Sequence, residues 1–85
     1  MIPTADRWGP FAEGIDPAEQ RARLRSLRAL ARVYAGPRAA NACRLLAQAE
    51  TDPAALEPAS VALNCLAPTD RRQIFASFAR LAATA

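Results

Sequence analysis

The 85-residue sequence contains no histidine and no lysine, and its three glycines are scattered along the chain. Without histidine the commonest general base and metal ligand is missing. Scattered glycines exclude a glycine-rich phosphate loop. No pair of acidic residues sits three or four positions apart on an apolar helix face, as a carboxylate dyad or di-metal site would require. We therefore predict that the protein is not an enzyme and that it binds no metal and no cofactor.

Cysteine and long apolar runs are also scarce. Cys43 and Cys65 are too few for a disulfide-stapled secreted domain. Because both lie among apolar neighbours, we expect them to pack in the core as small hydrophobic residues. Residues 1–15 lack the basic start and apolar run of a signal peptide, and no stretch approaches the roughly 20 apolar residues of a membrane span. These features favour a cytoplasmic protein with no membrane partner.

The N-terminal segment is rich in residues that oppose regular structure. Two prolines and two glycines fall within residues 1–15 and predict an extended N-terminal arm. Trp8 and Phe11 lie in this arm. Large aromatic side chains on an extended segment are expected to dock, either on the core of this protein or on a partner.

The rest of the sequence has helical features throughout. It is rich in alanine, the best helix former. Asp16 is a good N-cap, Pro17 suits a first helical position, and Gly36 with Pro37 ends a helix, which predicts a helix over residues 17–35. A second helix follows from residue 37 or 38 to about residue 50.

Proline also divides the C-terminal half. Asp52 and Pro53 begin a new element, but Pro58 would lie too deep in a helix that starts there. We expect a short turn over 53–57 and a buried, apolar helix over 58–66, with a single kinked helix as the alternative. Thr69 is the expected N-cap of a last helix that ends near residue 83. The predicted fold is all-α: a compact bundle of about four short helices, forming a single helical domain over 16–85 behind the N-terminal arm.

All eleven basic residues are arginines, and four of them are regularly spaced in the first helix. At 100° per residue, these four fall within an arc of about 60°, well apart from the apolar face. We call them the arginine ridge: Arg21, Arg25, Arg28 and Arg32. No acidic residue of this helix after Glu19 lies within reach of the ridge, so an acidic partner is one interpretation. A solvated face and the coding bias of a GC-rich genome are the alternatives. Arg25→Ala is then expected to leave the melting temperature unchanged or slightly raised.

A second group of polar residues opens the last predicted helix. Arg71 and Arg72 oppose the helix dipole there. The helix over 58–66, the tight link and the last helix resemble a helix-turn-helix in outline, although the link lacks the glycine that such turns often contain. In that motif the first residues of the second helix face the DNA bases. Here those residues are Thr69, Arg71, Arg72 and Gln73.

Three functional hypotheses follow from these features. The first is a small non-enzymatic regulatory or adaptor protein that binds an acidic protein partner through the arginine ridge, with Trp8 and Phe11 in support. The alternative is a DNA-binding transcriptional regulator that uses the helix-turn-helix-like pair. The second alternative is a homodimeric structural or assembly component.

Overall fold

The first helix begins and ends where local sequence dictates. The computed structural model describes residues 14–84, in which α1 spans Pro17–Ala35, as predicted. The carboxylate of Asp16 accepts a hydrogen bond of 3.0 Å from the Ala18 N–H. Gly36 ends α1 with φ at 57°, a value that side chains other than glycine's rarely allow. The predicted arm lies outside the described residues except for positions 14 and 15, and so do Trp8 and Phe11.

The second helix starts later than predicted because a turn of 3-10 helix precedes it. This turn, η1, spans Gly36–Ala39, and α2 spans Ala40–Ala49. A 3-10 turn is common at the beginning of an α-helix. Three residues one helical turn apart bury one face of α2: Ala42, Leu46 and Ala49.

The predicted short turn and separate helix around Pro58 are both present, but the helix begins and ends two residues earlier than predicted. A 3-10 turn, η2, spans Pro53–Ala55, and its first N–H groups are capped by Asp52, whose Oδ1 accepts 3.0 Å from the Ala54 N–H. The third helix, α3, then spans Leu56–Asn64. Pro58 therefore lies in the first turn of α3, where its missing N–H has no helical partner to lose. The proline neither breaks nor kinks the helix.

The last helix, α4, spans Pro68–Thr84 and corrects the expectation for Thr69. The Arg71 N–H donates 2.9 Å to the Ala67 carbonyl, so the helix begins before Thr69. Proline at the first helical position is favoured because its fixed φ suits a helix. Thr69 is consequently a first-turn residue and not the N-cap.

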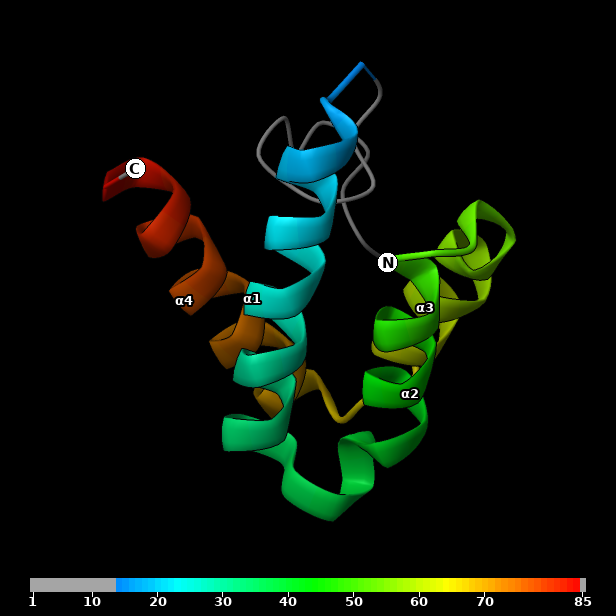
Figure 1. Ribbon diagram of the computed structural model, residues 1–85. Helices are drawn as coiled ribbons and strands as arrows, with labels where there is room; N and C mark the ends of the chain where they lie inside the picture. The colour runs from blue at the N-terminus through cyan, green and yellow to red at the C-terminus, as the bar shows by residue number, and fades with distance from the viewer. Residues whose placement is uncertain (1–13, 85) are drawn as a thin grey trace.

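The helices pack side by side in the spatial order α4, α1, α2, α3. As Figure 1 shows, α1 lies between α2 and α4, and α3 packs on the side of α2 away from α1. The all-α class and the compact bundle are confirmed, with no strand among residues 14–84. The fully buried large side chains come from all four helices: Leu24, Leu27, Leu46, Leu63 and Ile74. A hydrogen bond of 2.8 Å between the Tyr34 hydroxyl and Ser77 Oγ also joins α1 to α4.

The third helix is less buried than its composition suggests. Leu63 is completely buried, but Val61 is 55% exposed and Cys65 is exposed. The expectation that Cys65 belongs to the core is therefore wrong. Because α3 makes its main contact with α2 alone, only one of its faces is covered. Cys43 fits the prediction better, since it is half-buried and packs against the core, and both thiols are free.

Candidate functional site

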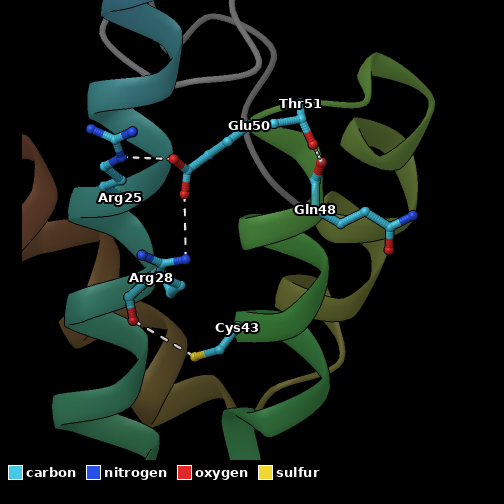
Figure 2. Close-up of polar contacts among 6 residues, drawn as sticks. All are labelled: Arg25, Arg28, Cys43, Gln48, Glu50 and Thr51. Carbon is cyan, nitrogen blue, oxygen red and sulfur yellow. Dashed lines mark hydrogen bonds and ion pairs between the residues drawn. The ribbon is translucent and has the colours of Figure 1, made fainter.

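The middle of the arginine ridge is paired with an acidic residue from another helix. Arg25 Nε donates 2.7 Å to Glu50 Oε1, and Arg28 Nη1 lies 3.3 Å from Glu50 Oε2. Figure 2 shows both guanidinium groups extending from α1 toward Glu50 at the end of α2. The prediction concerned only the acids of the first helix after Glu19, and the acid that pairs with the ridge in the folded chain comes from the end of α2 instead.

Glu50 occupies an electrostatically demanding position. It is the C-cap residue of α2, where the helix dipole disfavours a negative charge, and only 11% of its side chain is exposed. Burial of a carboxylate is costly unless it is paired with cations or hydrogen-bond donors. Arg25 and Arg28 provide that pairing, so part of the ridge holds the end of α2 against α1.

The two ends of the ridge remain open. Arg21 and Arg32 are exposed, and neither guanidinium group has a hydrogen-bond or ion-pair partner among residues 14–84. They differ in their surroundings, because Arg32 borders a groove and Arg21 does not. Because Glu50 pairs with the middle of the ridge, the unpaired positive charge is not continuous along α1.

An open groove lies between the C-terminal half of α1 and the facing side of α2. We call it the α1–α2 groove. Arginines from both helices border it: Arg28, Arg32 and Arg44. Small or apolar residues make up the rest of its lining: Gly36, Pro37, Ala40, Cys43 and Ala47. Cys43 Sγ donates 3.6 Å to the Arg28 carbonyl across the gap between the helices, as Figure 2 shows.

The arginines of the groove retain most of their hydrogen-bonding capacity. A guanidinium group has five N–H donors in a planar fork. Among the described residues, Arg44 donates through Nη2 to Asn41 Oδ1 at 2.7 Å, Arg28 meets Glu50, and Arg32 has no partner. The groove is therefore lined by three arginines, from two helices, whose guanidinium groups have donors to spare. Such an arrangement suits a carboxylate or a phosphate.

The second predicted group, at the start of α4, is divided between structure and surface. Arg71 Nη1 donates 2.7 Å to the Asn64 carbonyl and so caps the C-terminal end of α3. Thr69, Arg72 and Gln73 are exposed. In a helix-turn-helix the two helices form one unit, whereas here α3 packs mainly on α2, and α4 packs mainly on α1. Only the three exposed residues are open to a ligand.

Other kinds of site receive no support from the described part of the chain. No cluster of three or more potential metal ligands occurs among the described residues. A second groove, between α2 and α3, is mostly apolar and contains the exposed Val61 and Cys65. No helix described in the structure has the length and apolar character needed to span a bilayer.

Two residues that shape the site are absent from the sequence-based predictions. Arg44 lies in a different helix from the ridge. Its position in the helical repeat indicates only that it faces away from the apolar side of α2. Glu50 looks like an ordinary helix-end acid, and its partner Arg25 lies 25 positions earlier. The spacing of acids and bases within each helix carries no information about pairs between helices.

Comparison with known proteins gives no further assignment. No family model matches the chain, and no curated protein or solved structure is significantly similar to it.

Proposed function

We propose that this chain is a small non-enzymatic binding module, of the regulatory or adaptor kind, that recognises an acidic segment of a protein partner in the α1–α2 groove. One observation carries the proposal: Arg28, Arg32 and Arg44 reach the same groove from two helices. Their unused donors supply charge-assisted hydrogen bonds to carboxylates, and the apolar lining between them accommodates a side chain.

The charge of the chain supports an acidic partner. Its eleven arginines and eight carboxylate side chains leave a net charge of +3. A cationic surface of this kind accelerates the encounter with an anionic partner and disfavours cationic ones. Arg25 adds to the local field, since its side chain is 64% exposed and shares the Glu50 carboxylate with the groove residue Arg28.

The proposal is tested by titrating the protein with a fluorescent peptide of alternating glutamate and alanine, at low and at high ionic strength. A peptide with glutamine in place of glutamate is the control. We expect binding of the glutamate peptide alone, weakening with salt as exposed charges are screened. Equal binding of both peptides, or of neither, contradicts the proposal.

The DNA-binding alternative depends on the exposed Thr69, Arg72 and Gln73 at the start of α4. It predicts binding to a duplex, with an affinity that falls with salt by about 0.9 log units per log unit for each neutralised phosphate. Duplex binding that is lost on Arg72→Ala and retained on Arg32→Ala favours this alternative. The homodimer alternative depends on exposed apolar residues such as Val61, and light scattering that shows a dimer favours it.

A further inference from the structure

We infer that the preferred ligand of the α1–α2 groove is a phosphomonoester on a side chain of the partner protein, such as a phosphoserine. This inference rests on the proposed function and specifies the chemical group that the site recognises. It starts from the difference between the predicted arginine ridge and the observed distribution of free guanidinium groups.

The folded chain brings arginines of two helices together at the α1–α2 groove. A continuous ridge along α1 would suit an extended acidic surface. Instead, Glu50 engages the two central members, Arg25 and Arg28, and Arg44 of α2 joins Arg32 at the groove. The free charge is therefore compact, and a compact anion matches it better than a line of carboxylates does.

A phosphomonoester matches the groove in both charge and acceptor number. It carries a charge of about −1.5 to −2 at neutral pH and three strong acceptor oxygens. Three arginines border the groove, and with Arg25 they make four guanidinium groups against the single carboxylate of Glu50, leaving a local charge of +3. A phosphate therefore offers more acceptor oxygens and more charge to these donors than a carboxylate, which has two oxygens and one charge.

Two of the three arginines are already held in position. Glu50 contacts Arg28 and Asn41 contacts Arg44. Each of these two arginine side chains has therefore lost part of its rotamer freedom before an anion binds. Preorganised side chains lower the entropic cost of binding. The Arg32 side chain is exposed and has no partner in the described part of the chain, so all the N–H donors of its guanidinium group are available to the anion. The phosphate is expected to sit among these three groups, with its peptide along the apolar lining.

The experiment compares three fluorescent peptides that differ at one central position, which is phosphoserine, glutamate or serine, flanked by alanines. Anisotropy titrations at low ionic strength measure each affinity. We expect the phosphoserine peptide to bind at least about tenfold more tightly than the glutamate peptide, which corresponds to one additional charge-assisted contact. The serine peptide is expected not to bind.

Matched variants locate the site. Arg32→Gln and Arg21→Gln each remove one exposed, unpaired guanidinium group from α1, but only Arg32 borders the groove. We expect Arg32→Gln and Arg44→Gln each to weaken binding of the phosphopeptide about tenfold, and Arg21→Gln to change it less than about threefold. Melting curves of all three variants verify that the fold is retained.

The outcomes separate the two proposals. Tight phosphopeptide binding that depends on Arg32 and Arg44 supports both. Equal affinity for the glutamate and phosphoserine peptides overturns the phosphomonoester preference and leaves the acidic-partner function intact. Phosphopeptide binding that is equally sensitive to Arg21→Gln and Arg32→Gln overturns the assignment to the groove. If neither the phosphopeptide nor any glutamate peptide binds at low ionic strength, both proposals are wrong.

Discussion

Replacing Glu50 with glutamine is expected to destabilise the fold, because Glu50 connects the end of α2 to α1. Exposed ion pairs contribute about 0.2–1 kcal/mol, and breaking a fully buried pair costs about 3–5 kcal/mol. Glu50 lies between these cases, since its side chain is 11% exposed while those of Arg25 and Arg28 are 64% and 34% exposed. A loss of about 1–2 kcal/mol follows for the two contacts.

Part of this loss is recovered elsewhere. Glutamine removes a negative charge from the C-terminus of α2, which is favourable by about 0.3–1 kcal/mol. The net expectation for Glu50→Gln is a destabilisation of about 1 kcal/mol, which lowers the melting temperature of a domain of this size by about 4–8 °C. Thermal unfolding followed by far-UV circular dichroism measures this change. The difference from wild type is expected to shrink in high salt without vanishing, because the carboxylate is shielded from solvent.

A matched control and a double-mutant cycle test whether the pairing of Glu50 with Arg25 stabilises the fold. Glu57→Gln removes the same charge from an exposed side chain that has no partner in the described part of the chain, so it loses only the favourable helix-dipole interaction in the first turn of α3, and its effect should stay within about 0.5 kcal/mol at physiological salt, which screens that interaction. Combining Glu50→Gln with Arg25→Gln should give a coupling energy of about 0.5–1 kcal/mol. Equal melting temperatures for Glu50→Gln and Glu57→Gln, or no coupling to Arg25, would show that the pair is not structural.

Three further changes test the packing and the other polar contacts. Phe78→Ala should cost about 3–5 kcal/mol, measured by urea unfolding, because the ring is only 3% exposed in the core; a cost below about 1 kcal/mol would contradict its placement. Tyr34→Phe should cost about 0.5–1.5 kcal/mol in the same assay, since it removes the hydrogen bond of 2.8 Å to Ser77 and keeps the ring. Arg38→Ala should cost less than about 1 kcal/mol at low salt and nothing in high salt, because its side chain is 68% exposed although its Nη2 lies 2.8 Å from Asp70 Oδ2.

The sequence predicts those parts of the fold that depend on nearby residues. The bounds of α1 follow from Asp16, Pro17 and Gly36, each of which acts on its own turn of helix. The predicted start of α3 is wrong because the same residues are compatible with a longer turn that ends before Pro58 and with a shorter turn that places Pro58 inside the helix. Asp52 and Pro53 begin a 3-10 turn, and the extra turn brings Pro58 into a permitted position at the start of the next helix.

Long-range relations explain the remaining differences. The apolar composition of α3 does not reveal how many neighbours cover it, and Cys65 is exposed because α4 makes its main contact with α1 instead. The same limitation applies to the candidate site. The spacing of the arginine ridge is local, but its pairing with Glu50 depends on how α1 and α2 approach each other. The expected effect of Arg25→Ala accordingly changes from neutral to destabilising.

The reversal of the chain at Gly36 has a consequence for the order of folding. The α1–α2 groove is built from one continuous stretch, Arg28 to Ala47, in which the two helices are joined only by η1. Contacts between neighbours in sequence close small loops and form quickly. The α1–α4 contact joins distant parts of the chain and closes a larger loop. We therefore expect both walls of the groove to come together before α4 docks on α1.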